Sequence, residues 1–360
     1  MTAPNSLRIQ AGTLANFAAE ALEAAGCSEA DAREFAHCLV QSNLWGVDSH
    51  GVLRLPDYLA RLRSGAMNPR PHIHTLRAAG GLEVLDADNG PGFLAAAAAM
   101  SRAIELARAG GLGAVGVVNS NHCGAAALYA RQAVAQDMIG IAMSNVAPNM
   151  VAEGCSSPVT GNNPIAIAIP TFGEFPFVLD ISLSAVAGGK LLAAASRGES
   201  IPLGWATDRA GRPTTDPKAG FDGFLLPMGG HKGFGLSLAV DLLCGLVTGG
   251  AFQHHLKSMY RYPGEPSRTA HLVIAMNPLA IATREELTGR FAEFIDTLRR
   301  TPRWDGGETL LPGELEHRAE LERRQNGIPL PATLVDQLDR LGAASGVATR
   351  LAPLTPAPAA

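Results

Sequence analysis

A histidine, an arginine and a tyrosine follow one another at intervals of four residues in the first third of the chain: His50, Arg54 and Tyr58. If residues 48–65 form a helix, these three side chains share one face of it. The His50 imidazole titrates near neutral pH and can move a proton, Ser49 can orient it, and Arg54 offers a planar fork that suits a carboxylate. The spacing is typical of an anion site, and equally typical of a solvated surface helix.

Two further stretches carry amides and hydroxyls beside apolar segments, in loops of the kind that form sites. Residues 119–124 (NSNHCG) follow a predicted strand and open a helix, so their backbone N–H groups can receive phosphate or another anion. His122 within them is a second candidate proton carrier, although a packed or capping histidine fits the pattern as well. Residues 160–164 (TGNNP) place Thr160 before a strand, in a composition that is also typical of a plain turn.

Two stretches in the second half of the chain contribute further candidate binding groups, one carboxylate and two lysines. Residues 180–184 (DISLS) end a predicted strand with a carboxylate and two hydroxyls, which can hold the ribose or nicotinamide of a dinucleotide. Lys190 lies just downstream of them. Residues 230–233 (GHKG) place Lys232 before an apolar helix, an arrangement that suits a phosphate or carboxylate and also a solvated loop.

Residues 111–116 (GLGAVG) match the dinucleotide-binding pattern GxGxxG letter for letter. That pattern needs a strand before the glycines and a helix after them. Here an alanine-rich predicted helix, 93–109, precedes the glycines, and a predicted strand, 114–118, follows them. We therefore interpret the glycines as the end of a helix and a turn.

Helices and short apolar strands alternate along the chain, which predicts an α/β fold with a sheet covered by helices. Two helices come first, and Ser28 and Asp31 have the spacing of a capping box at the start of the second. The later strands and closing helices that we expect are strands 139–144, 164–170, 177–180 and 271–275 and helices near 125–136, 283–300 and 313–341.

Composition argues against several classes of protein. Of the 360 residues 47% are hydrophobic and 17% are charged, the net charge is −4 and no basic run is present, so we expect no nucleic-acid partner. The absence of a signal peptide and of an apolar helix of about 20 residues predicts a cytoplasmic protein with no membrane partner. Five cysteines without a CxxC pair predict neither a disulfide framework nor a metal site.

Five motifs in order resemble the type-2 malate/L-lactate dehydrogenase family, over about residues 10–345. They are DSHGVLRLPDY at 48–58, NSNHCGA at 119–125, TGNNPIAIAIP at 160–170, DISLSAVAGGK at 180–190 and LLPMGGHKGFG at 225–235. The resemblance implies a homodimer and a non-Rossmann α/β fold, with a mixed sheet of about seven strands flanked by helices. We expect a helical N-terminal region at 1–75 completed by C-terminal helices at 296–345, a cofactor-binding core at 76–295 and a disordered tail at 346–360.

The same resemblance implies roles for individual residues. His50, held by Ser49, and His122 are implied as the catalytic acid/base groups. The residues implied to bind the substrate are Arg54, Tyr58, Thr160 and Lys190. The residues implied to contact the cofactor are His122, Cys123, Gly124, Ala125, Ala126, Asn145, Asp180, Ile181, Ser182, Gly230, His231, Lys232, Gly233 and Gly235.

The activity that the resemblance implies is hydride transfer between NAD or NADP and C2 of a small 2-hydroxy or 2-oxo carboxylate such as malate, lactate or sulfolactate. A neutral histidine must then accept the proton of the hydroxyl, and an arginine must fix the carboxylate. A cyclic imino acid reductase is an alternative, but such reductases tend to carry an aspartate where Lys190 stands. A catalytically silent dinucleotide-binding sensor is a third alternative.

Overall fold

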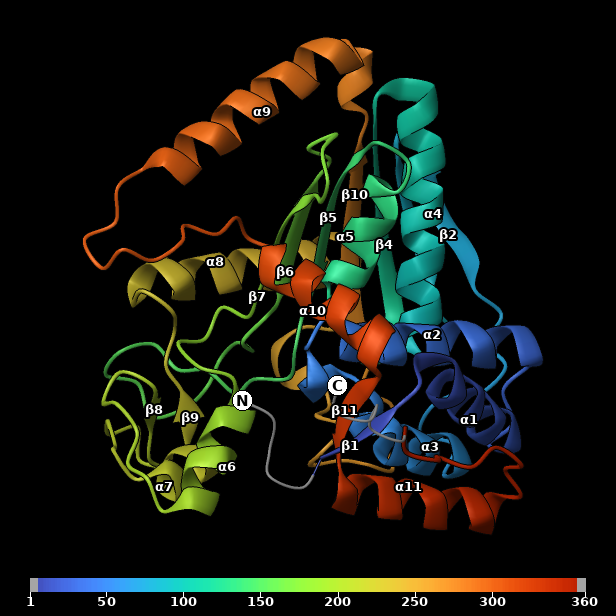
Figure 1. Cartoon of the computed structure of the whole chain (residues 1–360). Helices are drawn as coiled ribbons and strands as arrows, with labels where there is room; N and C mark the ends of the chain where they lie inside the picture. The colour runs from blue at the N-terminus through green and yellow to red at the C-terminus, as the bar shows by residue number, and fades with distance from the viewer. Residues whose placement is uncertain (1–5, 355–360) are drawn as a thin grey trace, which may run out of the picture.

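A mixed sheet of seven strands forms the centre of the computed structural model, which describes residues 6–354 (Figure 1). The strand order is β2-β3-β4-β10-β5-β6-β7, so the predicted mixed α/β fold is confirmed. The bounds are β2 (His74–Ala79), β3 (Leu82–Asp86), β4 (Leu112–Ser120), β5 (Ile139–Ser144), β6 (Ile165–Ile169), β7 (Phe177–Ile181) and β10 (Thr269–Met276).

Strand direction brings the sequence motifs to one edge of this sheet. β10 is antiparallel to both β4 and β5, and β6 is antiparallel to both β5 and β7, so β4, β5 and β7 run in the same direction. The chain leaves these three strands at the same edge, where it enters β6 and β10. Residues 121–126, 145 and 182–184 follow the three strand ends, and residues 160–164 precede β6.

Helices cover both faces of the sheet (Figure 1). α4 (Gly92–Gly110) and α5 (Ala127–Val134) contact β4, β5 and β10 on one face, and α8 (His231–Asp241) with its π-helical continuation η3 (Leu242–Val247) contacts the same strands. Gly113 of β4 packs on α4, whereas Gly116 packs on Thr248 just after η3. Because these two positions point to opposite sides of a strand, α4 and η3 lie on opposite faces.

The end of α4 explains the glycine-rich stretch that follows it. Gly111 caps α4 in the left-handed conformation, with φ of +83°, and β4 begins at the next residue. A residue with a Cβ is strained at such an angle, so glycine is the usual choice at the end of a helix. The interpretation of GLGAVG as a helix end and turn is therefore confirmed.

A helical body lies beside the sheet and is built from both ends of the chain (Figure 1). Its elements share one apolar core, and β1 pairs with β11 in an antiparallel ribbon. Ser28 caps α2 as predicted, by accepting from the N–H of Asp31 at 3.2 Å. The elements are β1 (Ser6–Ile9), α1 (Ala11–Ala24), α2 (Glu29–Leu44), α3 (Leu55–Arg63), α10 (Glu314–Asn326), β11 (Ile328–Pro331) and α11 (Ala332–Ser345).

The C-terminal part of this body corrects two expectations. A helix over 313–341 is wrong, because Gly327 has φ of +80° and two prolines follow it in β11, which separates α10 from α11. The prediction of a disordered tail from residue 346 is also wrong for residues 346–354. Leu351 is 2% exposed in the apolar core, and the N–H of Leu354 donates to the carbonyl of Arg8 at 2.8 Å. Residues 355–360 lie outside the described part of the chain.

A smaller lobe with its own apolar cluster follows β7 in the chain. It contains α6 (Gly188–Arg197), β8 (Ala206–Thr207), α7 (Pro217–Asp222) and β9 (Phe224–Leu225). Short 3-10 turns are found at η4 (Gln253–His255) and η5 (Pro278–Ala280). Within residues 6–354, none of the helices has the length and apolar character that a membrane span requires.

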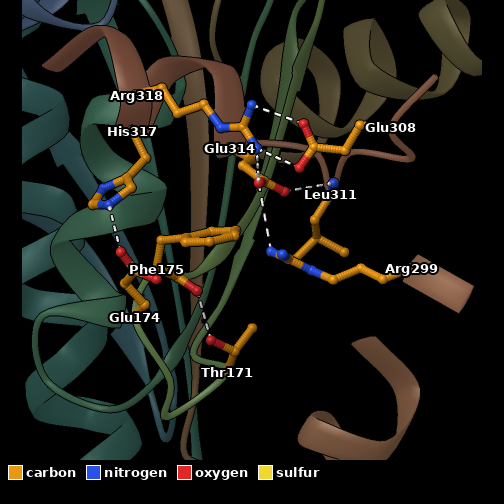
Figure 2. Close-up of polar contacts among 9 residues, drawn as sticks. All are labelled: Thr171, Glu174, Phe175, Arg299, Glu308, Leu311, Glu314, His317 and Arg318. Atoms are coloured by element: carbon orange, nitrogen blue, oxygen red, sulfur yellow. Dashed lines mark hydrogen bonds and ion pairs between the residues drawn. The ribbon is translucent and has the colours of Figure 1, made fainter. Parts of the chain in front are cut away.

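α9 (Arg284–Arg300) stands away from the body and has no buried residue (Figure 1). The connection from α9 to α10 is held by a carboxylate that is itself buried, that of Glu314 (Figure 2). This carboxylate pairs with Arg318 at 2.6 Å and with Arg299 at 3.4 Å, and it accepts from the N–H of Leu311 at 3.2 Å. Two guanidinium groups and one amide therefore satisfy a charge that would otherwise be costly to bury.

Candidate functional site

The segment that carries His50 and Arg54 is not a single helix. Two 3-10 turns, η1 (Asp48–His50) and η2 (Val52–Arg54), precede α3, which begins only at Leu55. Gly51 between the turns is extended, with φ of −89° and ψ of −152°. The predicted helical face that joins His50, Arg54 and Tyr58 is therefore wrong, although the three residues still gather at one site.

Asn43, near the end of α2, imposes this local shape. Its side-chain oxygen accepts from the N–H of Val52 at 2.9 Å, and its amide donates to the Asp48 carboxylate at 2.7 Å. A Cβ on Gly51 would lie 2.2 Å from the Asn43 oxygen, so only glycine leaves room for the asparagine. Arg323 of α10 pairs with Asp48 at 2.7 Å. The turn that presents His50 is thus fixed from both ends of the chain.

Three rings meet between α3 and the loop that follows β4. The Tyr58 hydroxyl lies 2.7 Å from Nδ1 of His122, 64 residues later in the chain. The imidazoles of His122 and His50 are nearly parallel, at 17°, with centroids 5.7 Å apart. The Ser49 hydroxyl lies 2.9 Å from Nδ1 of His50. The structure therefore brings together both predicted proton carriers and the serine beside them.

Tyr58 lies behind His122, in the apolar core. It is 1% exposed, and the rings of Phe35 and Phe93 pack against it edge-on at 5.1 and 5.4 Å. Burial raises the pKa of Tyr58 well above its ordinary value, so the phenol keeps its proton. This position favours support of His122 over the direct substrate contact that the resemblance implies.

Both imidazoles of the site are neutral at pH 7. Burial, with Arg54 adding its charge, lowers the pKa of His50 to about 4. Burial, followed by the charges of His50 and Arg54, lowers the pKa of His122 to about 3. Each side chain nevertheless remains partly accessible to solvent. The two imidazoles can therefore contact a ligand, although protein atoms cover most of their surface.

Arg54 supplies the cation that a carboxylate ligand needs. Its Nε donates to the carbonyl of Ser49 at 3.0 Å, while the paired carboxylate of Asp57 stays 3.6 Å from Nη1. The ring of Tyr260 lies under the guanidinium, 5.2 Å from Cζ to the centroid. The terminal N–H groups of Arg54 are therefore available for a fork-shaped contact with a carboxylate.

Arg61 joins this region to the loop that carries Tyr260. Its guanidinium is 2% exposed and donates to the Asn121 side chain at 3.0 Å and to the Ser267 hydroxyl at 3.1 Å. It also donates to the backbone carbonyls of residues 262, 263 and 265. One buried cation thus fixes the loop over Arg54 to the turn that holds His122.

Sequence reasoning missed Asn43, Arg61 and Tyr260 as parts of the site. Arg61 had a usable signal, since it stands among Tyr58, Leu59 and Leu62 on the apolar side of α3, where a charge requires partners. Asn43 had no such signal, because its bonds to Asp48 and Val52 follow no helix or strand spacing. Tyr260 had none either, because its contact with Arg54 joins distant parts of the chain.

Two buried polar clusters hold the strand ends beside the histidines. His271 of β10 lies between the hydroxyls of the serines that end β4 and β5, at 2.9 Å from each. Asp241 lies 3.4 Å from the Asn145 amide and 3.3 Å from the Thr160 hydroxyl. Asn145 and Thr160 are both 0% exposed, so the ligand contacts that the resemblance implies for them stay predictions.

Asp180 faces the start of α5 from the end of β7. Its carboxylate accepts from the N–H of Ala127 at 2.9 Å, while crowding by protein atoms raises its pKa to about 6. The side chain remains accessible to solvent, so it can also meet a polar ligand. Of the other implied cofactor contacts nearby, Cys123, Gly124, Ala125 and Ala126 are buried, and Ile181 and Ser182 are half-buried.

The start of α8 fits a phosphate group of a dinucleotide. His231 and Lys232 are exposed in its first turn. Gly230 has φ of +64°, and neither there nor at Gly235 would a Cβ meet any atom within 4 Å, so the backbone is open to a ligand. Helix N–H groups beside a lysine attract anions.

This turn also lies beside the segment that contains Asp180. The N–H of Met228 donates to the carbonyl of Leu183 at 2.9 Å. Gly233 is packed tightly, because a Cβ there would lie 2.0 Å from the carbonyl oxygen of Met228. The predicted dinucleotide contacts at 180–182 and 230–235 thus come from neighbouring parts of the fold.

Lys190 stands apart from the histidines. It is exposed in the first turn of α6, in the smaller lobe, and no contact within the described residues joins it to His50 or His122. Its binding of substrate stays a prediction. Over the same described residues, no three His, Cys, Asp or Glu side chains are grouped as a metal would require.

Comparison with known proteins places the whole chain among dehydrogenases. Residues 9–339 match the family model described as malate/L-lactate dehydrogenase. The chain is 37% identical to a malate dehydrogenase of Pyrococcus abyssi, over 95% of this chain and 96% of that protein. It is 38% identical to a (2R)-3-sulfolactate dehydrogenase (NADP(+)) of Chromohalobacter salexigens, over 89% and 94%. It resembles the solved sulfolactate dehydrogenase of Methanocaldococcus jannaschii with a TM-score of 0.88 and 34% identity, over 94% and 98%.

The buried histidines make stability depend on pH. Between the ordinary histidine pKa of about 6.5 and the lowered value of His122, the unfolded chain binds a proton that the folded chain does not. The free energy of unfolding therefore falls as pH is lowered from 6.5 toward 4. In His122→Gln we expect this slope to be shallower by up to ~1.4 kcal/mol per pH unit.

Urea unfolding at pH 7, 6 and 5 measures this slope. His231→Gln, a substitution of the exposed histidine at the start of α8, is the control and should keep the wild-type slope. An unchanged slope in His122→Gln would contradict the burial of a neutral imidazole.

Proposed function

The chain belongs to the malate/L-lactate dehydrogenase family, and we propose that it transfers a hydride between NAD or NADP and C2 of a small 2-hydroxy or 2-oxo carboxylate. One observation carries this proposal: an arginine whose terminal N–H groups make, among the described residues, only a 3.6 Å ion pair with Asp57 lies near enough to two neutral imidazoles for its charge to act on both. A carboxylate bound to Arg54 brings its C2 oxygen within reach of His50 and His122. The related malate and sulfolactate dehydrogenases act on acids of this class.

The chemistry of such a substrate requires these groups. Oxidation of a 2-hydroxy acid frees the hydroxyl proton as the C2 hydrogen leaves with its electron pair, so a neutral histidine must be near. When bound, the nicotinamide takes up or supplies the hydride. Arg54 orients the acid so that C2 faces the cofactor, and such orientation contributes a large part of the rate.

We further propose that the cofactor lies along the sheet edge between Asp180 and the start of α8. The solvent-accessible carboxyl of Asp180 suits a ribose or nicotinamide group, and Lys232 with the helix N–H groups suits a phosphate. One relative is named for NADP(+), so both NADP and NAD belong in the test.

The proposed partner of the protein is a second copy of itself, in the cytoplasm, with no nucleic acid or membrane involved. η3 carries four exposed apolar side chains, Leu242, Leu243, Leu246 and Val247, which are 49, 38, 49 and 73% exposed. Contiguous apolar surface of this kind is typical of an interface between subunits. A homodimer joined through η3 would remove it from water.

The activity is tested by the absorbance of reduced nicotinamide. We expect NADH or NADPH to be oxidised in the presence of oxaloacetate, pyruvate or sulfopyruvate, because Arg54 and the imidazoles match a 2-oxo acid. Piperideine-2-carboxylate is the comparison substrate. Turnover of the cyclic imine alone would favour the imino acid reductase, and tight cofactor binding without turnover of any substrate would favour the sensor.

Arg54→Ala should raise KM for the 2-oxo acid by about 10- to 100-fold, since a charge-assisted hydrogen bond contributes roughly 1.5–3 kcal/mol. Arg54→Lys should recover only part of the loss, because an ammonium cannot make the two parallel bonds. Arg63→Ala, at an exposed arginine on α3, is the matched control. Steady-state kinetics with equal KM values in Arg54→Ala and Arg63→Ala would refute the assignment.

Val247→Asp should convert a dimer into a monomer, because it places a charge in the apolar face of η3. Light scattering on a gel-filtration column measures the mass. Leu203→Asp, at a residue that is 60% exposed between α6 and β8, is the control and should remain dimeric. A monomeric wild-type protein, or a dimeric Val247→Asp, would count against this interface.

A further inference from the structure

Nδ1 of His122 faces two hydrogen-bond donors. The Tyr58 hydroxyl lies 2.7 Å from this nitrogen, and the backbone N–H of Gly124 donates to it at 3.2 Å. A hydroxyl can reverse its direction, whereas a backbone N–H can only donate. Nδ1 must therefore act as an acceptor, and the proton of the neutral imidazole resides on Nε2.

The position of the Gly124 amide is fixed by packing. Gly124 has φ of +71°, and a Cβ there would lie 2.5 Å from the ring of Phe93. Only glycine therefore lets the loop pack this closely against Phe93 of α4. The same Phe93 ring packs against Tyr58. Both donors that face Nδ1 are thus held by one buried aromatic side chain.

A charged His122 would be doubly unfavourable. An imidazolium would bring an N–H of its own against that of Gly124. Burial is the largest cause that lowers the pKa of His122. The charges of four nearby groups lower it further: His50, Arg54, His271 and Arg61. At neutral pH His122 is therefore uncharged in the folded protein and has one fixed tautomer.

His50 is not restricted in this way. Its Nδ1 faces the hydroxyl of Ser49, which can donate or accept, so either ring nitrogen of His50 can carry the proton. The two rings are nearly parallel, with centroids 5.7 Å apart. Because an imidazole nitrogen bonds in the plane of its ring, a substrate oxygen that both histidines bind lies at the edges of the two rings, not between their faces.

We propose that the two histidines divide the work on the C2 oxygen: His50 exchanges the proton, and His122 donates a hydrogen bond from Nε2 without giving up its proton. In the oxidising direction the hydrogen on C2 leaves with its electron pair to the nicotinamide. The O–H bond breaks, its electron pair closes the C=O bond, and the proton passes to the free nitrogen of His50. The Nε2–H of His122 stabilises the negative charge that develops on the oxygen.

This division of roles rests on the proposed hydride transfer, but its first test does not need activity. Nitrogen-15 NMR of the protein with labelled histidine distinguishes a ring nitrogen that carries a proton from one that does not. We expect Nδ1 of His122 to be unprotonated and Nε2 to be protonated at pH 7, with the signals assigned by their loss in His122→Gln. A proton on Nδ1 would overturn the proposal whether or not the protein is a dehydrogenase.

Tyr58→Phe separates the two donors in the same experiment. It removes the hydroxyl and leaves the Gly124 amide in place, so Nδ1 of His122 should remain unprotonated. If Nδ1 gains the proton in this variant, the amide does not fix the tautomer, and the proposal fails.

Kinetics then tests the division of roles. A glutamine at position 122 keeps an amide N–H near the place of Nε2 and cannot accept a proton at neutral pH. We expect His122→Gln to keep kcat within about 10-fold of the wild type and to retain its pH profile, and His50→Gln to lose about 10²- to 10⁴-fold. A loss of that size in His122→Gln, together with a lost limb of its pH profile, would make His122 the proton carrier instead.

Discussion

The hydrogen bond between Tyr58 and His122 is the contact on which the candidate site depends. It joins α3 of the helical body to the loop that follows β4 of the sheet, at 2.7 Å and across 64 residues of chain. Together with the Arg61–Asn121 hydrogen bond at 3.0 Å, it holds the His50 turn and Arg54 of the helical body beside His122 and the strand ends of the sheet. The Tyr58 end of the bond is buried against Phe35 and Phe93, so water cannot reach the phenol from the core side.

Burial around this contact has a consequence for chemistry. A site that must bind a carboxylate and handle a proton usually attracts water, and water would weaken each of its interactions. Here the cations are either supported on an aromatic ring, as Arg54 is by Tyr260, or saturated by neutral oxygens, as Arg61 is. The imidazoles between them stay neutral. At pH 7 the positive charge of this region is thus carried by Arg54 and Arg61, and the two imidazoles add none.

Much of the fold and of the site was predictable from the sequence, through two kinds of information. Alternating apolar segments predicted an α/β fold with a sheet covered by helices, and the family resemblance carried by five motifs implied a mixed sheet of about seven strands. Gly111 after an alanine-rich helix predicted that GLGAVG ends a helix. The shape of residues 48–63 was not predictable from spacing, because Asn43 and Arg323 impose it from α2 and α10. Tyr260 was missed for a related reason, because its role arises where distant segments meet, whereas Arg61 could have been recognised as a charge on the apolar side of α3.

The order of residues 346–354 likewise depends on a core assembled from both ends of the chain. A segment rich in alanine and proline is typical of disorder, yet Leu351 finds an apolar site between elements that lie more than 300 residues apart. Local composition describes what a segment does in water, and it carries no information on whether a distant surface will cover it.

The most direct test of the account is to follow the hydride itself. Reduced nicotinamide carrying deuterium at C4 is mixed with the protein and a 2-oxo acid in ordinary water, and the product is examined by proton NMR and mass spectrometry. The account predicts a 2-hydroxy acid with one deuterium at C2 and a proton from solvent on its oxygen. A product without deuterium at C2 from either face of the labelled cofactor would contradict hydride transfer at this site.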